Sequence, residues 1–151
     1  MGILKEIIPI GNDHAGYQLK LNIASVLEKL GFYVDDRGTY STESVDYPDY
    51  IHPVAHAIEK GTVARGIIIC GSGNGAAMVA NKYQHVRAAL CWNSEIAMLA
   101  RLHNDANILA LPARFISTEE AMNIVRVFLT TSFEGGRHTT RVHKVSCLIV
   151  S

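Results

Sequence analysis

One stretch, ARGIIICGSGNGAAMVAN at residues 65 to 81, restricts the fold of this chain more than any other. Ile67, Ile68 and Ile69 form an unbroken β-branched run, which is typical of a parallel strand buried on both faces. Cys70 ends the run, and a glycine-rich turn at 71–75 follows, where positive φ or close backbone approach is expected. Small residues at 76–80 then predict a tightly packed helix. The stretch therefore predicts a strand, a turn and a helix of an α/β protein.

The glycine turn is similar to two phosphate-binding loops and matches neither. Its spacing G-x-G-x-G-A differs from the dinucleotide fingerprint, and no acidic residue stands at 91–93 to bind a ribose hydroxyl. No Lys-Ser or Lys-Thr pair follows the glycines, as a P-loop requires. Two interpretations of the turn alone stay open, a structural turn with an inert cysteine or a site with a reactive one. Free N–H groups at a helix start favour a thiolate at Cys70 and can hold an oxyanion.

Strands and helices alternate in the apolar pattern of the whole chain. Short apolar runs predict further strands at 7–10, 33–34, 86–91 and 108–111. Apolar residues at helical spacing predict helices over about 17–30 and 50–59, and two more helices after positions 94 and 117. Ser94 is the expected N-cap of the first of these two, and Ser117 or Thr118 that of the second. The pattern predicts a five-stranded parallel sheet covered by helices on both faces.

Polar residues follow several of these strands, where parallel sheets bind their ligands. Four clusters are expected at this edge: 13–14, 70–75, 93–94 and Arg114. Asp13 could simply cap a helix, but its position at the same edge as Cys70 favours membership of a site. His14 shares that position. The convergence of these clusters indicates a functional site rather than a structural turn.

Three further groups allow two interpretations each. His103 ends a helix, where it could interact with the dipole or take part in a site. Arg137 and Arg141 are four residues apart and could grip a phosphate, although their spacing alone favours a solvated basic tail. The pair at positions 52 and 56 has a spacing that can bind zinc, but no third ligand is evident, so these are interpreted as surface histidines.

Composition excludes several classes of function. The 151 residues suit one domain, and 14 basic against 14 acidic side chains give a formal net charge of zero. That balance argues against a nucleic-acid or membrane surface driven by charge. No apolar run approaches the ~20 residues of a membrane helix, and no signal peptide is recognisable. Three cysteines without CxxC spacing favour free thiols in a cytoplasmic protein.

Motifs along nearly the whole chain resemble the ribose-5-phosphate isomerase B family, whose group includes galactose-6-phosphate and allose-6-phosphate isomerases. The matching segments are GNDHAGYQLK at 11–20, ESVDYPDY at 43–50, GIIICGSGNG at 66–75, ANK at 80–82, RAALC at 87–91, HNDANILAL at 103–111 and FEGGRHTTRVHK at 133–144. The resemblance implies a Rossmann-like three-layer α/β/α fold over residues 1–151. It also implies an aldose–ketose isomerase that needs no metal and no cofactor and forms an enediol(ate).

The resemblance also implies roles for individual residues. Cys70 would be the base that moves a proton between C1 and C2, with the hydroxyl of Ser72 beside it. His103 would open the furanose ring, with Asp13 helping to hold that end, and Asn104 would bind the substrate. The residues of the turn that would hold the sugar oxygen are Gly71, Gly73, Asn74 and Gly75. The residues that would hold the phosphate are His14, Arg114, Arg137 and Arg141.

The resemblance further implies a pocket between two subunits, hence a homodimer or a dimer of dimers that shares active sites. The tail at 130–151 would contact the neighbouring subunit, and its apolar end, CLIVS, departs from the usual pattern. Pro9 replaces an aliphatic residue in the first strand, where a proline cannot donate to the ladder. Pro112 replaces a glycine and could shift Arg114.

Ribose 5-phosphate and ribulose 5-phosphate are the expected substrates, because GRHTTR at 136–141 resembles the ribose branch better than the galactose branch. A hexose 6-phosphate, allose or galactose 6-phosphate, is the alternative substrate. A non-catalytic module that binds a sugar phosphate is the alternative from another class.

Overall fold

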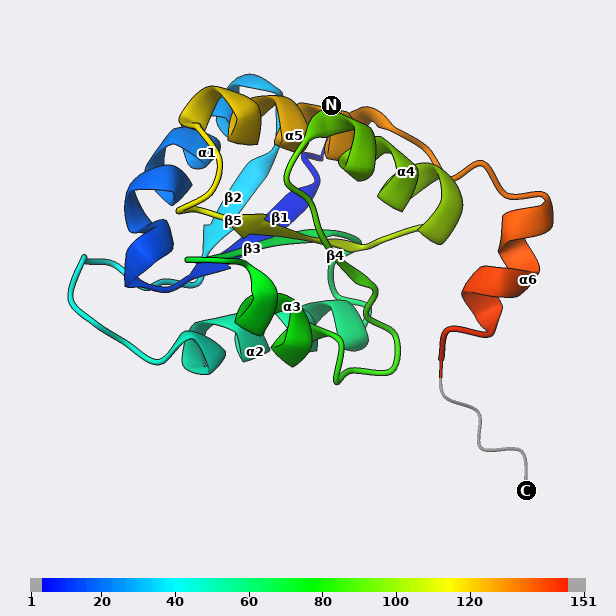
Figure 1. Ribbon diagram of the computed structural model, residues 1–151, viewed down its shortest axis with the longest axis horizontal. Coiled ribbons are helices and arrows are strands. Elements are labelled where there is room, and N and C mark those ends of the chain that lie inside the picture. Colours follow the sequence, from blue (N-terminus) through cyan, green and yellow to red (C-terminus); the bar gives the residue numbers. More distant parts are fainter. Residues whose placement is uncertain (1–3, 147–151) are drawn as a thin grey trace.

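The computed structural model describes residues 4–146 and forms three layers (Figure 1). The strands are β1 (Ile7–Asn12), β2 (Tyr33–Asp36), β3 (Gly66–Cys70), β4 (Ala88–Leu90) and β5 (Ile108–Pro112). The helices are the 3₁₀ turn η1 (His14–Gly16), α1 (Tyr17–Lys29), α2 (Tyr47–Glu59), α3 (Asn74–Ala80), α4 (Ser94–Asn104), α5 (Thr118–Thr130) and α6 (Arg137–His143). The strands pair in parallel in the order β2-β1-β3-β5-β4. The predicted five-stranded α/β/α fold is confirmed.

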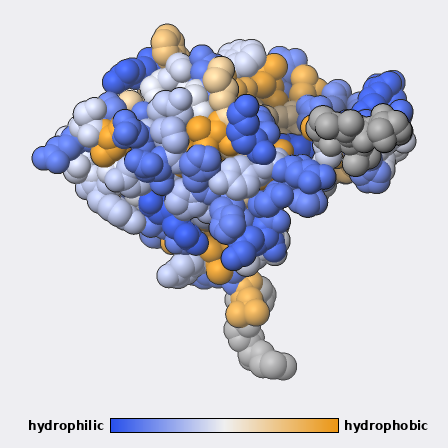
Figure 2. Space-filling model, turned by 90° about the horizontal axis from the view of Figure 1, so that it is seen from below, coloured by the Kyte–Doolittle hydropathy of each residue, from blue (hydrophilic) through white to orange (hydrophobic). Residues whose placement is uncertain are grey.

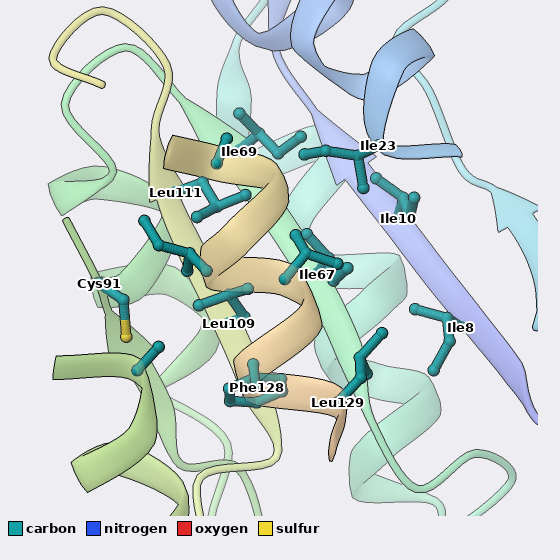
Figure 3. Packing of buried hydrophobic residues seen from close by; sticks show 14 of the residues in the cluster. Ile8, Ile10, Ile23, Ile67, Ile69, Cys91, Leu109, Leu111, Phe128 and Leu129 are labelled. Carbon is teal, nitrogen blue, oxygen red and sulfur yellow. The ribbon is translucent and has the colours of Figure 1, made fainter. Parts of the chain in front are cut away.

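The sheet separates two apolar cores because successive strand residues point to opposite faces. Ile67 and Ile69 pack with α1, α4 and α5 on one face, where Phe128 is fully buried (Figure 3). Ile68 and Cys70 pack with α2 and α3 on the other face. The Cys70 side chain therefore belongs to the core on the side of α2 and α3, which lie beneath the sheet in Figure 1.

Helix starts differ from the predictions in two places. The predicted N-cap Ser94 is wrong: Asn93 caps α4, because its extended backbone lets its amide oxygen accept the N–H of Ile96 at 2.9 Å. Helix α2 begins at Tyr47, three residues before the predicted start, with Pro48 in its first turn, where a missing N–H costs nothing. Ser117 caps α5 as predicted, in a capping box with Glu120.

Pro9 is tolerated in a central strand because of where its missing donor points. Asp13 donates to the carbonyl of Ile69, so alternate residues of β1, Pro9 included, turn their nitrogens toward β3. Pairing with β3 begins only at Ile10, so Pro9 lies just outside the ladder on that side. Its carbonyl and ring instead pack against Gly66.

Helix α6 lies to one side of the layered body, beyond α4, and packs against α4 (Figure 1). The sequence predicted only a basic tail here, because seven residues are too few for a clear apolar period. His138 and Val142, four residues apart, are its buried positions. Residues 147–151, which are the whole of the apolar end CLIVS, lie outside the described part of the chain. Between residues 4 and 146, none of the helices has the length and apolarity needed to cross a membrane.

Candidate functional site

The carboxyl ends of β1, β3 and β5 are joined by backbone hydrogen bonds at one edge of the sheet. Asp13 donates to the carbonyl of Ile69 at 3.1 Å, and Ala113 donates to that of Cys70 at 3.0 Å. Arg114 donates to the carbonyl of Gly71 at 3.0 Å. We call this group the Cys70 half, and it contains Asp13, His14, Cys70, the turn 71–75 and Arg114. In the predicted Asn93–Ser94 cluster, Asn93 caps α4, and the cluster follows the edge strand β4.

The two cysteines in the described residues occupy different surroundings. Cys70 ends β3 next to the glycine turn and retains 5% of its surface. Cys91 is fully buried in the larger core, and this burial raises the pKa of its thiol to about 12. The description of a buried, inert cysteine therefore fits Cys91.

The glycine turn is held in shape by contacts that exclude side chains. Gly73 adopts φ 77°, and a Cβ there would lie 2.4 Å from Leu90 Cδ1. At Gly75 a Cβ would lie 2.5 Å from the ring of Tyr47, the first residue of α2. Ser72 Oγ accepts the N–H of Asn74 at 3.3 Å. Tyr47, which the sequence analysis left unassigned, therefore forms a wall over this turn.

Asp13 and His14 are fixed by local hydrogen bonds. Asp13 Oδ1 accepts the N–H of Gly16 at 3.1 Å, so the residue does cap η1, as one of the two interpretations held. His14 Nδ1 accepts the N–H of Val45 at 3.2 Å. In a neutral imidazole the other nitrogen, Nε2, then carries the proton and is the free donor.

Buried Lys20 anchors the loop that supplies Val45. Its ammonium, 1% exposed, donates to Asp36 Oδ1 at 3.0 Å and to the carbonyl of Thr39. It also lies 5.1 Å from the ring centres of Tyr17 and Tyr40. A buried cation is stable only with such partners, so the start of the loop is firmly held beside β1.

Arg114 lies directly over the glycine turn. A Cβ on Gly71 would lie 3.2 Å from Arg114 Nη1, so the missing side chain leaves room for the guanidinium. Pro112 ends β5 in register with Cys70, and Arg114 remains beside Gly71 two residues later. Its side chain is exposed, which leaves donors available for an anion.

The remaining predicted residues, His103, Asn104, Arg137 and Arg141, lie on α4 and α6. We call these four residues, together with Glu134 and His138, the His103 half. The rings of His103 and His138 are stacked, with centroids 4.2 Å apart and planes inclined by 14°. Glu134 Oε2 lies 3.7 Å from His103 Nε2 and 3.4 Å from His138 Nε2. Arg137 and Arg141 are both exposed on α6.

His138 is the buried member of this half. It is 5% exposed, and its Nε2 has no hydrogen-bond partner among the described residues. Burial lowers the pKa of His138, and the charges of His103, Arg137 and Arg141 lower it further, while Glu134 opposes them. The ring is therefore neutral at neutral pH.

A clamp of ion pairs supports the turn that follows His103. Asp105 adopts φ 45°, which is rare for residues other than glycine, asparagine and aspartate. Its carboxylate pairs with Arg101 at 2.9 Å and with Arg87 at 3.5 Å. The side chain of Arg87 also donates to the carbonyl of Asn104 at 3.2 Å. These contacts hold the C-terminal end of α4, which carries His103 and Asn104.

The two halves lie at opposite ends of the sheet within one chain (Figure 1). Asn104 precedes β5 and Arg114 follows it, and the five residues of that strand span roughly 15 Å. The chain therefore brings Asp13, His14, Cys70 and Arg114 together, and separately His103, Asn104, Arg137 and Arg141. It does not bring the two sets together.

His103, Glu134 and His138 have the donor atoms of a metal site, and these atoms lie within 4.8 Å of one another. Stacked imidazoles direct their lone pairs along nearly parallel planes, so the two nitrogens do not converge on one ion. The trio instead suits proton exchange and anion binding together with the two arginines of α6.

The fold and these side chains match a known class of proteins. The family model for ribose/galactose isomerases matches residues 8–145. Ribose-5-phosphate isomerase B of Escherichia coli is 43% identical over 93% of this chain and 95% of its own length. A putative sugar phosphate isomerase of Rickettsia conorii is 45% identical over 91% of this chain and 96% of its own length.

Solved structures agree with these sequence relatives. Ribose-5-phosphate isomerase B of Clostridium thermocellum superposes with a TM-score of 0.90 at 51% identity, covering 92% of this chain and 94% of that one. The Mycoplasma genitalium enzyme, solved with bound ribulose-5-phosphate, gives 0.90 at 41% identity, covering 95% of each chain. The chain belongs to the ribose/galactose isomerase family and is therefore an enzyme of the sugar-phosphate isomerase class.

The structure adds three side chains that the sequence analysis did not assign. Glu134 and His138 were within a matching segment, and their four-residue spacing around two glycines was the available signal. Tyr47 was also within a matching segment, but nothing in its local pattern indicates contact with Gly75, 28 residues later.

Proposed function

We propose that the chain interconverts ribose 5-phosphate and ribulose 5-phosphate in an active site assembled from two copies of itself. The observation that carries the proposal is the separation of the Cys70 half from the His103 half. Each half supplies groups that the reaction needs, and neither half is sufficient alone. The Escherichia coli and Mycoplasma genitalium relatives, both named ribose-5-phosphate isomerase B, support the choice of a pentose phosphate.

Cys70 is the base for the proton transfer. Its sulfur removes the proton on C2 of the open-chain aldose, and the electrons of that bond form the enediolate. A proton moves from O2 to O1, and the thiol returns a proton to C1, which gives the ketose. A base of tuned pKa and preorganised donors are what this chemistry requires. The Ser72 hydroxyl and the backbone amides of the turn 71–75 stabilise the negative oxygen.

His103 opens the furanose ring before this transfer. Opening breaks the bond between C1 and the ring oxygen O4, while the hydroxyl on C1 loses its proton and O4 gains one. An imidazole can perform both transfers near neutral pH. Asp13 holds the same end of the sugar, and Asn104 binds a hydroxyl.

The phosphate is bound by cationic and donor groups from both halves. His14 offers its free Nε2–H, and Arg114 offers a guanidinium beside Gly71. Arg137 and Arg141 project from α6, and planar guanidinium groups can bind phosphate oxygens in pairs. Binding energy at this remote phosphate orients the reacting carbons over Cys70.

A symmetric dimer would form two such sites at once, because a twofold axis brings each half against the other half of its partner. The tail 130–151 then contacts the partner through α6. Exposed apolar side chains near the glycine turn support a covered surface there: Tyr47 is 37% exposed and Met78, on α3, is 65% exposed. Figure 2 views the face of α2 and α3 and shows apolar patches among polar side chains.

The direct test is a substrate panel with the purified protein. We expect higher kcat/KM on ribose 5-phosphate than on allose 6-phosphate or galactose 6-phosphate. The opposite order would favour a hexose phosphate isomerase, which the family description also covers. In D₂O, deuterium must enter the recovered sugar, and binding without exchange would indicate a non-catalytic module.

Cys70→Ala tests the base in the same assay. We expect turnover to fall by ~10²–10⁴-fold, the usual contribution of a general base. Cys91→Ala is the matched control, since that buried thiol lies in the other core. Near-wild-type turnover of Cys70→Ala would remove Cys70 from the mechanism.

A further inference from the structure

The carboxylate of Glu134 faces the same nitrogen of two stacked histidines. Its Oε2 lies 3.7 Å from His103 Nε2 and 3.4 Å from His138 Nε2. These distances exceed a hydrogen bond by a few tenths of an ångström, and Glu134 is 57% exposed, so its side chain has room to close onto one ring. Such contacts commonly tighten only when substrate binds.

His103 and His138 differ in what they can do with this carboxylate. His138 is buried and neutral at neutral pH, because burial lowers its pKa. It lies on α6, which packs against α4, and its ring stacks on the His103 ring. His103 is 39% exposed, so it is the more accessible of the two rings. Glu134 lies on the Nε2 side of both rings, and His103 is the ring that a ligand can reach more easily.

A carboxylate beside one imidazole nitrogen selects the tautomer that carries its proton there. In His103 the nitrogen nearest the carboxylate is Nε2, and a proton there would leave the lone pair on Nδ1. The charged and titratable groups around this ring are Glu134 and His138 on one side and Arg137 and Arg141 farther along α6. On its own helix, Arg101 is already paired with Asp105.

We propose that Glu134 is a positioning residue that holds His103 with Nε2 protonated, so that Nδ1 is the atom that exchanges protons with the furanose during ring opening. This inference rests on the proposed role of His103 and extends it to a particular nitrogen and a further side chain. In the opening step, Nδ1 accepts the proton of the C1 hydroxyl, the C1–O4 bond breaks, and the same nitrogen returns the proton to O4. His138 prevents the His103 ring from turning over.

Glu134→Gln in the full-length protein tests the proposal kinetically. Ribose 5-phosphate is mainly a closed furanose, whereas the phosphate on O5 keeps ribulose 5-phosphate from forming such a ring. We expect kcat for ribose 5-phosphate to fall ~10²-fold, as for a misplaced catalytic group, with little change in KM. Exchange of the C1 protons of ribulose 5-phosphate with D₂O should remain near the wild-type rate. Glu134→Asp should recover part of the lost turnover.

Glu95→Gln is the matched control, because Glu95 lies in the first turn of the helix that ends near His103. It should leave both rates unchanged. Equal loss of ribose 5-phosphate turnover and ribulose 5-phosphate exchange in Glu134→Gln would contradict a role confined to ring opening.

The tautomer can be measured without any activity. Nitrogen-15 NMR of labelled protein should show His103 with a protonated Nε2 and an unprotonated Nδ1 in the wild type, and a mixture of tautomers in Glu134→Gln. An unchanged His103 spectrum would overturn the proposal, even if the enzyme isomerises ribose 5-phosphate. His103→Gln examines the underlying function separately: unaltered turnover there would reject His103 as the ring-opening group, whatever Glu134 does.

Discussion

The Cys70 half and the His103 half are built in different ways. Backbone hydrogen bonds between β1, β3 and β5 fix the first, and the positions of Gly73 and Gly75 leave no room for a side chain. Side-chain contacts at helix ends fix the second: a stacked histidine pair, a shared carboxylate and an ion-pair clamp on Asp105. Cys70 and its glycine turn are thus attached directly to the sheet, whereas His103 and the arginines of α6 are held by side-chain contacts on helices.

The largest expected effect comes from recombining the two halves. Cys70→Ala and His103→Gln homodimers should each lose ~10²–10⁴-fold in turnover, because each lacks one half of both sites. A dimer that pairs one chain of each variant should recover one intact site of two. Two affinity tags on co-expressed chains allow this mixed dimer to be purified, and its kcat should approach half of the wild-type value per dimer.

The opposite outcome is a mixed dimer that is as inactive as the two parent homodimers. It would mean that Cys70 and His103 serve the same site within one chain. The mixed dimer of wild type with Cys70→Ala is the control for subunit exchange.

A smaller effect is expected when a side chain is forced into the glycine turn of the Cys70 half. Gly73→Ala and Gly61→Ala both place alanine at positive φ, 77° and 74° respectively. This backbone conformation should lower the free energy of unfolding by ~1–2 kcal/mol in each variant. Only at Gly73 does the new Cβ also meet Leu90 and the backbone of Leu111 and Pro112, which adds ~1–3 kcal/mol. Urea denaturation at one protein concentration measures both. Equal losses would show that packing does not constrain the turn.

The His103 half should show its character in the pH dependence of stability. Burial lowers the pKa of His138 from its usual 6.5, so the unfolded chain binds this proton more tightly than the folded one. The stabilisation is complete above about pH 6.5 and is lost as the pH falls. In His138→Gln the unfolding free energy should depend less steeply on pH below about 6.5. If the unfolding free energies of variant and wild type changed with pH in the same way, His138 would not contribute to the pH dependence of stability.

The smallest effect concerns the other buried thiol. Burial raises the pKa of Cys91 to about 12, so a negligible fraction is thiolate at about pH 8. Iodoacetamide should leave Cys91 unlabelled in the folded protein and label it after denaturation, as peptide mass spectrometry would show. Rapid labelling of folded Cys91 would mean that the larger core opens readily.

Much of this fold was predictable because each strand carries its own signal. The β-branched run before Cys70 and the helical spacing in α1 and α5 are local patterns, and the structure reproduces them. Helix starts were less certain, since neighbouring Asn93 and Ser94 can both cap, and the backbone conformation decides between them. Helix α6 was not predicted because its two buried residues, His138 and Val142, form no local apolar pattern and are buried only by contact with α4.

The site was predictable at one end of the sheet and not at the other. Residues that follow parallel strands must meet at one edge, so Asp13, Cys70 and Arg114 could be grouped from order along the chain. No comparable rule groups His103 with Glu134, because the ends of helices meet through side-chain packing. Resemblance to a family indicated His103 and the arginines, and the coordinates then revealed the histidine stack between them.

Helix α6 packs against α4 at the margin of the molecule, while the sheet and both cores are complete without it. Changes on its exposed face can therefore be sampled during evolution with little penalty in folding. Under the proposed function, the face that carries Arg137 and Arg141 can therefore change without altering the strands and turn that hold Cys70.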